Sequence, residues 1–261
     1  MIANQTIPRK GARRVDGIPP AVLAQLNHGE IESRSHEESL AIDFAVLMRS
    51  AVPRIPCEAT AEMHKARALP IAERMALAGR LLLNHLGPVA YLHLARHRAD
   101  TVRGWAAHLL AAAPQFSLGE RLKLIRPLAN DRNSSVREWA RVALRSQIAA
   151  NVATAIDLLE EWTTSGSPFL RRFASEATRP RGNWCPRIAR LVARPDLGLP
   201  LLEPLRADPH RYVQDSVADW LSDAAINKPD WVRSVCARWQ RESRSKSTSR
   251  ICRRAMQDLA G

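Results

Sequence analysis

The sequence predicts an all-α protein, a right-handed α-solenoid of HEAT-like helix pairs whose concave face is basic. No stretch alternates β-branched with polar residues, as a half-buried strand would, whereas the helix formers Ala, Leu and Arg are abundant. A short motif recurs at a spacing typical of helical repeats. Basic residues outnumber acidic ones by 39 to 26, and most of the excess lies in the last two-thirds of the chain.

The chain has 261 residues and 46% hydrophobic content, enough to bury a sizeable core, and we divide it into three parts. Residues 1–20 are interpreted as a mobile basic arm. Residues 21–86 are interpreted as an N-terminal helical cap, and residues 87–261 as the repeat solenoid that carries the groove and the site. Helical periodicity predicts three helices in the cap: Ala21–Asn27, Glu37–Met48 and Ile71–Leu86.

The repeated motif combines a polar turn with the first residues of a helix. It occurs at Asp100–Ala106, Ser134–Ala140 and Pro168–Ala174, and more loosely at Arg211–Val217. The aligned positions are 34, 34 and 43 residues apart: Arg103, Arg137, Arg171 and Gln214. This period predicts stacked helix pairs. We expect the apolar residue and the Ala of each motif to face the core, and the Arg to point outward or along the seam between repeats.

Start and stop signals show that the helices of the solenoid are short. Ser117 followed by Glu120 has the pattern of a capping box, which predicts a helix start at this point. Prolines fall near the expected helix boundaries after it. They are Pro127, Pro168, Pro180, Pro186, Pro195, Pro200, Pro209 and Pro229.

The charge distribution indicates a polyanion as the partner. Arg accounts for 34 of the basic residues and Lys for 5, and Arg is the side chain that binds phosphate bidentately. Residues 1–80 carry 11 basic and 9 acidic residues, whereas residues 81–261 carry 28 and 17. An Arg-rich solenoid with interleaved Trp is typical of a nucleic-acid groove. The alternative is that most Arg side chains are solvated helix faces and most Trp side chains are core.

Several kinds of site have no support in the sequence. No apolar run is long enough for a membrane span, and the first residues lack the apolar stretch of a signal peptide. The four cysteines form no C-x-x-C pair, and His93 and His97 have no evident third ligand. We expect a cytoplasmic, nucleoid-associated monomer with reduced thiols, without a metal, small-molecule cofactor or membrane partner.

Three carboxylates occupy unusual positions in this basic region. Glu138 follows a motif Arg, Glu176 lies among several Arg residues, and Asp223 lies near a Trp. Each falls in or just after the inner helix of a successive repeat, so the three are expected to converge. An acid that faces a polyanion is electrostatically unfavourable and therefore needs a reason. The alternative is a structural salt bridge to a neighbouring Arg.

Two long segments resemble the AlkC-like DNA alkylation-repair glycosylases. Leu170–Trp184 is similar to a signature of the family that contains S-E-G-x-R-P-R, and Tyr212–Asp223 is similar to a second one. Leu26–Glu30 and Leu40–Asp43 also resemble the N-terminal region of the family. The resemblance implies a HEAT-like solenoid that removes positively charged alkylated bases from double-stranded DNA. Such bases include 3-methyladenine, 3-methylcytosine and 7-methylguanine.

The resemblance also implies roles for individual residues. Glu138, Glu176 and Asp223 become the catalytic candidates, since carboxylates stabilise an oxocarbenium-like sugar and orient water. The alkylated base leaves as a neutral molecule, so neither a general acid nor a metal is required. The candidates for phosphate contacts are Arg137, Arg171, Arg172, Arg179 and Arg181. The candidates for a wall around the lesion or sugar are Trp139, Trp184 and Trp220, each with a core position as the alternative.

The sequence departs from the family pattern at a few positions. Ala177 replaces a Gly, Gly182 and Asn183 replace Leu-Pro, and Gln214 replaces an Arg. Three hypotheses follow. The first is a DNA glycosylase for alkylated bases. The second is a non-catalytic HEAT-repeat protein that binds DNA structure, and the third is a protein-interaction scaffold. The Arg-rich half and the retained acids favour the first two.

Overall fold

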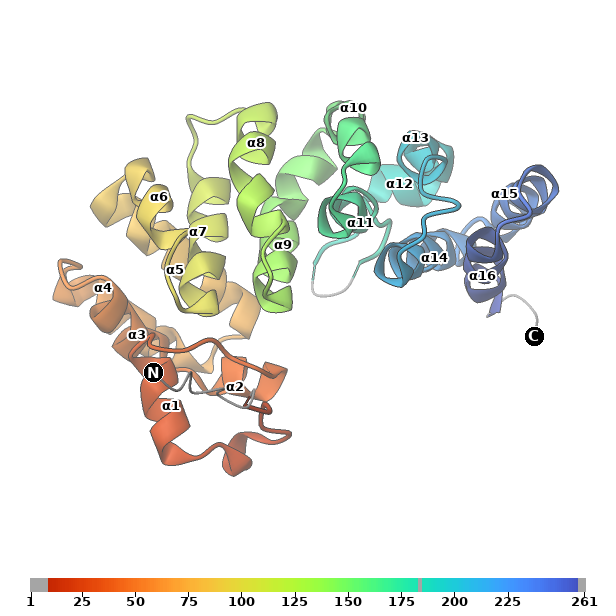
Figure 1. Ribbon diagram of the computed structural model, residues 1–261. Coiled ribbons are helices and arrows are strands. Elements are labelled where there is room, and N and C mark those ends of the chain that lie inside the picture. The colour runs from red at the N-terminus through yellow and green to blue at the C-terminus, as the bar shows by residue number, and fades with distance from the viewer. Residues whose placement is uncertain (1–8, 183–184, 258–261) are drawn as a thin grey trace, which may run out of the picture. The chain divides into compact units, whose positions relative to one another are not determined.

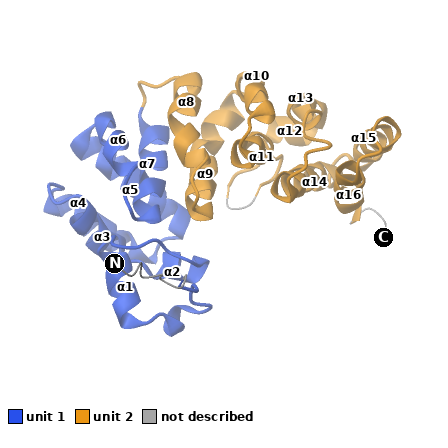
Figure 2. Cartoon of the chain, in the orientation of Figure 1, with its two compact units in different colours: residues 1–113 blue, residues 114–261 orange. Residues whose placement is uncertain are grey.

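The computed structural model describes residues 9–182 and 185–257, and all regular elements in these ranges are helices. The predicted all-α class is therefore confirmed. The chain forms two compact units, residues 1–113 and 114–261 (Figure 2). Our sequence-based division placed a boundary at residue 86 instead. The difference arises because the helix before that residue packs closely against a helix that follows it, so residues 87–113 join the first unit.

The first unit contains seven α-helices among its described residues. They are α1 (Pro20–Asn27), α2 (His36–Ala41), α3 (Phe44–Ala51), α4 (Cys57–Lys65), α5 (Ile71–Leu86), α6 (Tyr91–Leu94) and α7 (Asp100–Ala112), with short 3-10 turns at Val15–Gly17, Ala66–Ala68 and Pro88–Ala90. The helix predicted at 71–86 has the same bounds in the structure. The helix predicted at 37–48 is instead two helices. Asp43 separates them, because its side chain accepts hydrogen bonds from the Ala45 and Val46 amides and so starts α3.

The described part of the predicted arm is attached to the first unit. Arg9 donates to both carboxylate oxygens of Glu38, at 2.5 and 2.9 Å, and the Ala12 amide donates to the same group at 3.0 Å. Burial opposes ionisation of Glu38, but these hydrogen bonds outweigh it and lower its pKa. Residues 9–18 therefore differ from the mobile segment that we expected. Residues 1–8 lie outside the described residues.

Helices α5 and α7 approach each other closely in the first unit. Gly79 makes this possible, since a Cβ atom at this position would lie 2.6 Å from the Cβ of His108 on α7. The side chain of His108 is buried by this packing. Burial lowers the pKa of His108 from 6.5 to about 4, with a smaller effect from the charge of Arg80. His108 is therefore neutral in the folded unit at neutral pH.

The buried His108 makes the stability of the first unit depend on pH. The pKa of His108 is lower in the folded state than in the unfolded chain. The free energy of unfolding is therefore unaffected by this group above pH 6.5, and it decreases as the pH falls from 6.5 toward 4. We expect a loss of about 3 kcal/mol over this range. Hydrogen exchange of the α7 amides between pH 7 and 4 measures it. His108→Asn should remove most of this pH dependence, whereas His85→Asn, at an exposed position of α5, should retain it. An equal pH dependence of stability in the two variants would contradict the assignment of this effect to His108.

The second unit is built from paired helices. The helices α9, α11, α14 and α16 pack against one another in this order and form one row (Figure 1). The helices α10, α13 and α15 lie between them in the chain, and α8 packs against α9 and α10. The bounds are α8 (Leu118–Ala129), α9 (Ser134–Ala150), α10 (Val152–Glu160), α11 (Pro168–Ala177), α12 (Ala189–Ala193), α13 (Leu199–Leu202), α14 (Arg211–Ala225), α15 (Pro229–Glu242) and α16 (Lys246–Ala255), with 3-10 turns at Glu161–Thr164 and Pro195–Gly198. The capping box predicted at Ser117 is present.

The motif residue of each repeat connects its helix to the preceding turn. In three repeats the guanidinium donates from Nη1 to the carbonyl oxygens six and five residues earlier, at 2.6 to 3.2 Å; these residues are Arg103, Arg137 and Arg171. Gln214 donates from Nε2 to the carbonyl of Asp208, also six residues earlier, at 2.8 Å. The Gln in place of Arg therefore preserves the contact. The repeated motif is explained by the need to satisfy these turn carbonyls.

Candidate functional site

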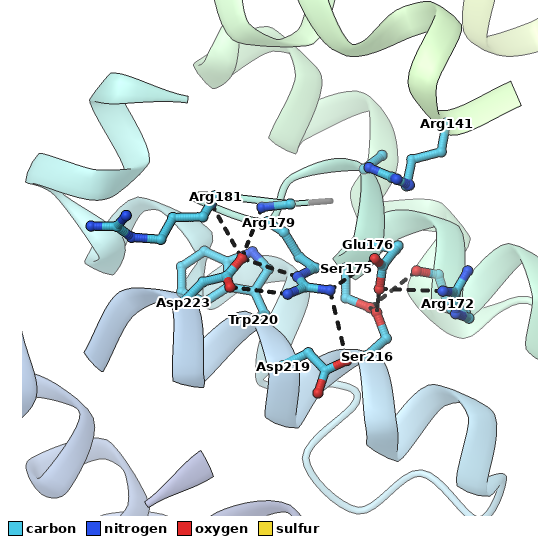
Figure 3. A network of polar contacts seen from close by, with 12 residues as sticks. Arg141, Arg172, Ser175, Glu176, Arg179, Arg181, Ser216, Asp219, Trp220 and Asp223 are labelled. Carbon is cyan, nitrogen blue, oxygen red and sulfur yellow. Dashed lines mark hydrogen bonds and ion pairs between the residues drawn. The ribbon is translucent and has the colours of Figure 1, made fainter. Parts of the chain in front are cut away.

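A network of charged side chains lies in the second unit, where α9, α11 and α14 are neighbours (Figure 3). Glu176 is at its centre, in the last turn of α11, and its side chain is only 5% exposed. The Ser216 hydroxyl donates to Oε2 at 2.7 Å, and Arg179 donates to Oε1 at 3.1 Å. Arg172, one turn earlier on α11, forms an ion pair with Oε2 at 3.5 Å. Both oxygens of this buried carboxylate are therefore in polar contact.

The surroundings of Glu176 keep its carboxyl group ionised. Burial alone would raise its pKa and is the largest single effect. The charges of three arginines and the hydroxyl of Ser216 outweigh it, so that the pKa lies below its usual value of 4.5. The arginines, in decreasing order of effect, are Arg172, Arg179 and Arg141. The site therefore contains a negative charge at neutral pH.

Asp223, near the end of α14, is held by the loop that follows α11. Arg179 donates to it bidentately, from Nε and Nη2, at 3.0 Å each. The backbone amides of Arg181 and Gly182 donate to Oδ2 at 3.2 and 3.0 Å. Gly182 has a φ of +58°, which a residue with a side chain rarely adopts and which allows the loop to turn at this point. The loop therefore surrounds a carboxylate that comes from the next repeat.

Arg179 joins the two acids. It is buried and contacts Glu176 and Asp223 directly, and it lies 3.7 Å from Asp219 (Figure 3). Burial lowers its pKa, but the bidentate bond to Asp223 and the surrounding acids have the larger combined effect and raise it. One guanidinium thus holds carboxylates from α11 and α14 together. Glu176 and Asp223 were predicted to converge, and in the structure they share this partner.

Glu138, on α9, extends the same network. Its carboxylate pairs with Arg141, which is buried and also donates to the Cys185 sulfur at 3.3 Å. The charge of Arg141 in turn lowers the pKa of Glu176. The three candidate acids, which come from α9, α11 and α14, are therefore linked through arginines. Glu138 is the most accessible of the acids, with 35% of its side chain exposed against 12% for Asp223.

Arg145 contributes to the site, although its sequence position alone did not identify it as a candidate. Its side chain is buried and makes three hydrogen bonds to backbone carbonyls of the loop after α11. The acceptors are Ala177 at 3.0 Å, Arg179 at 2.6 Å and Pro186 at 3.0 Å. Arg145 stands one repeat length, 34 residues, before Arg179. The repeat spacing could have identified Arg145 as a candidate. In the structure it is a buried side chain that binds carbonyls of the loop, and it is not an exposed cation.

Arg137, predicted to contact phosphate, is instead buried at the junction of three helices. Besides the turn carbonyls, it donates to the Tyr212 hydroxyl at 3.3 Å. Its guanidinium carbon lies 4.0 Å from the ring centre of Phe169. The contacts that this side chain makes are internal, because the motif Arg serves the packing of the repeat. The structure therefore assigns it a structural role.

Arg171 and Arg172 also make internal contacts. Arg171 donates bidentately to Asp208 at 2.6 and 3.1 Å, in addition to its turn carbonyls. Arg172 lies over the ring of Tyr212, 4.3 Å from its centre, and pairs with Glu176. The prediction that this group forms the phosphate contacts is corrected for Arg171, whose guanidinium is already satisfied.

The predicted aromatic wall is also corrected in part. Trp220 is fully buried, and its indole nitrogen donates to the Thr178 carbonyl at 3.1 Å. A Cβ atom added to Gly198 would lie 2.4 Å from its ring, so the ring is packed against backbone. Trp220 is therefore a core residue. Trp139 is half-buried on α9, and Trp184 lies outside the described residues.

No cluster of three or more His, Cys, Asp or Glu side chains suited to a metal occurs within the described ranges. His97 accepts a hydrogen bond from the Ala99 amide at 3.1 Å, which gives it a local structural contact. None of the helices in these ranges is long and apolar enough to cross a membrane.

Comparisons with known proteins agree with this architecture. The sequence profile of the family described as DNA alkylation repair enzyme matches residues 116–257, which include the whole charged network. The uncharacterized protein YhaZ of Bacillus subtilis (strain 168) is 32% identical over 125 residues, or 48% of this chain and 34% of YhaZ. The chain therefore spans about a third of the length of that relative.

Two solved structures share the fold. Pseudomonas fluorescens alkylpurine DNA glycosylase AlkC, bound to DNA containing an abasic site analog, is 24% identical, with a TM-score of 0.66 over 85% of this chain and 62% of that one. The smu.31 protein of Streptococcus mutans UA159 is 22% identical, with a TM-score of 0.56 over 75% of this chain and 94% of that one. The likeness to AlkC confirms the predicted helical-repeat fold. The profile match shows the family: the chain belongs to the DNA alkylation repair enzymes.

Proposed function

We propose that this protein is a DNA glycosylase that excises cationic alkylated bases from double-stranded DNA. 3-Methyladenine is the first candidate substrate, and 3-methylcytosine and 7-methylguanine are the next. The observation that carries the proposal is the convergence of Glu138, Glu176 and Asp223, from three successive repeats, within one network. Family membership and the fold shared with AlkC support it.

The chemistry of the site suits the cleavage of an N-glycosidic bond. As this bond breaks, positive charge develops on the deoxyribose, and nearby ionised carboxylates stabilise that charge. The lowered pKa of Glu176 keeps this group in the required form at neutral pH. An alkylated base is already cationic and leaves as a neutral molecule. The reaction therefore needs a carboxylate to orient water, but no general acid.

The arginines of the network act as internal counterions for the acids in the ligand-free protein. A cationic base, or the cationic sugar that forms after it, carries the same charge as a guanidinium and competes for the same carboxylates. We expect the most exposed acid, Glu138, to meet the lesion or sugar first. Arg179 keeps the less exposed acids in place behind it.

Release of 3-methyladenine from methylated duplex DNA tests the proposal. The purified chain should release the free base, and Glu138→Gln should slow this release at least tenfold because a charge near the sugar is lost. Glu160→Gln is the matched control, since Glu160 is an exposed acid of the same unit on α10. This variant should release 3-methyladenine at the same rate as the unchanged protein.

Absence of release by the unchanged protein, on DNA that it binds, would contradict the proposal. That result would favour the second candidate, a DNA-structure-binding protein without catalysis. A specific observation supports this candidate: each of the three acids already contacts an arginine, as purely structural ion pairs would.

A further inference from the structure

The charged network raises the question of which cations bind the DNA backbone. The guanidinium groups of Arg137, Arg171 and Arg179 all bind internal partners. A polyanion is bound by cations that are exposed and available to exchange their counterions. Exposed basic side chains outside this group are therefore better candidates for the phosphate contacts. Their assignment rests on the proposed function and concerns the place where the DNA backbone is bound.

A basic pocket lies beside the network. Its volume is about 420 Å³, and it is lined by Arg187, Ala189, Val192, Ala193, Asn227 and Lys228. Two of the six are cations and none is an acid. Arg187 and Lys228 are both exposed, and neither side chain has an ion-pair or hydrogen-bond partner among the residues that the structure describes. We call this feature the Arg187/Lys228 pocket.

The Arg187/Lys228 pocket is connected to the Asp223 carboxylate. Asn227 accepts a hydrogen bond from the Arg181 side chain at 2.7 Å, while the Arg181 amide donates to Asp223. Figure 3 shows the Arg181 side chain extending away from the acids. One residue, Arg181, thus contacts both the site acid and the lining of the pocket, an arrangement that suits a sugar at the carboxylate and the phosphate of the same strand beside it.

We propose that the Arg187/Lys228 pocket binds a DNA phosphodiester that flanks the lesion. An Arg offers a planar fork for two phosphate oxygens, and a Lys adds a point charge. Three small apolar side chains of α12 also line the pocket, which suits the apolar edge of a deoxyribose. Lys228 is also the N-cap of the 14-residue helix α15, whose dipole favours an anion at this end.

A pair of charge-matched double variants tests the assignment. The first, Arg187→Gln with Lys228→Gln, removes both pocket cations. The second, Lys123→Gln with Arg241→Gln, removes two exposed cations of the same unit that do not line the pocket. Both lower the net charge by the same amount, so any difference reflects position. The probe is a duplex with an abasic-site analog, and its Kd is measured between about 50 and 200 mM salt. Thermal unfolding confirms that each variant is folded.

The pocket variant should bind the duplex about tenfold more weakly at about 50 mM salt, as expected for the loss of a charge-assisted contact. The slope of log Kd against log salt should fall by about 0.9, the value for one phosphate. The control variant should change the Kd less than about threefold. Equal weakening of the two variants would overturn the proposal, because only total charge would then matter.

Two further measurements distinguish phosphodiester binding at the pocket from catalysis and from binding of a free anion. If the unchanged protein releases no base but the pocket variant still loses duplex affinity, the glycosylase proposal fails and the pocket assignment stands. Titration with inorganic phosphate tests for a free anion as the ligand. Orthophosphate binding that only the pocket variant loses, together with unchanged duplex affinity, would overturn the assignment to DNA.

Discussion

Replacing Glu176 by Gln, or Asp223 by Asn, is expected to lower the rate of base excision at least a hundredfold. Both changes preserve the size of the side chain and remove a negative charge beside the developing cation. Loss of one preorganised electrostatic contact of this kind costs roughly a hundredfold to a thousandfold in rate. DNA affinity should stay equal or rise, because a negative charge leaves a surface that faces a polyanion.

Single-turnover release of 3-methyladenine measures this effect, with duplex binding measured on the same samples. Asp215→Asn is the control, since Asp215 lies about two turns before Asp223 on α14 and pairs with Arg254 at 3.1 Å, outside the network around Arg179. Its excision rate should stay within about threefold of that of the unchanged protein. If Glu176→Gln excised bases as fast as the unchanged protein, Glu176 would not act in the reaction.

The pH dependence of excision gives an independent test of Glu176. The reaction needs the ionised carboxylate, and the neighbouring arginines lower the pKa of this group below 4.5. Its contribution to excision should therefore stay constant from pH 8 to pH 5 and decline only below about 4.5. A decline centred near pH 6 would show that a different group controls the rate.

Removing Arg179 is expected to cost the largest amount of stability. Arg179→Met keeps much of the side-chain volume but leaves Glu176 and Asp223 without their common counterion in a buried site. Loss of one partner from a buried ion pair costs about 3–5 kcal/mol, because the remaining charge is uncompensated. Urea unfolding of the second unit, followed by Trp fluorescence, measures this loss.

The stability of Arg179→Met should also depend on pH in a characteristic way. In the unchanged protein, Glu176 has a lowered pKa, so its contribution to stability is present above pH 4.5 and is lost as the pH falls. In Arg179→Met one of the charges that lower this pKa is absent, so the pKa of Glu176 should be higher than in the unchanged protein. The difference in stability between the two proteins should therefore be largest at neutral pH and should shrink below about pH 4.5.

Arg254→Met is the control for this stability effect. Arg254 also pairs with acids of α14, Asp215 at 3.1 Å and Asp219 at 2.8 Å, but 44% of its side chain is exposed. Exposed pairs contribute about 1 kcal/mol or less. A loss for Arg179→Met as small as that for Arg254→Met would show that the buried acids do not depend on the cation.

Much of the fold could be predicted from the sequence, because the signals that define its helices involve residues close together in the chain. The helix 71–86 follows from uninterrupted apolar periodicity, and the start at Ser117 follows from a capping box that involves only neighbouring residues. The helix that was predicted at 37–48 is two helices in the structure, which shows that apolar periodicity alone does not locate helix ends. Apolar spacing continues through Asp43, but the side chain of this residue caps a new helix.

The candidate acids could also be found from the sequence, through the resemblance and the repeat spacing. Glu176 and Asp223 were expected to converge because equivalent helices of stacked repeats are neighbours, and the structure places both on Arg179. The division of the arginines could not be found in this way. Residue type alone does not distinguish Arg171 from Arg187, yet Arg171 is bound to Asp208 whereas Arg187 lines an open pocket.

The sequence by itself therefore determined the helical class and the repeat, since these depend on residue type and spacing along the chain, and its resemblance to the family supplied the candidate acids. Only the tertiary structure decided which charges face inward and which remain for a ligand. The reason is physical. A guanidinium reaches several ångströms from its helix and binds whichever acceptors the neighbouring helices offer. Its role depends on contacts between residues that are far apart in the sequence, such as Arg145 with the Pro186 carbonyl and Arg179 with Asp223.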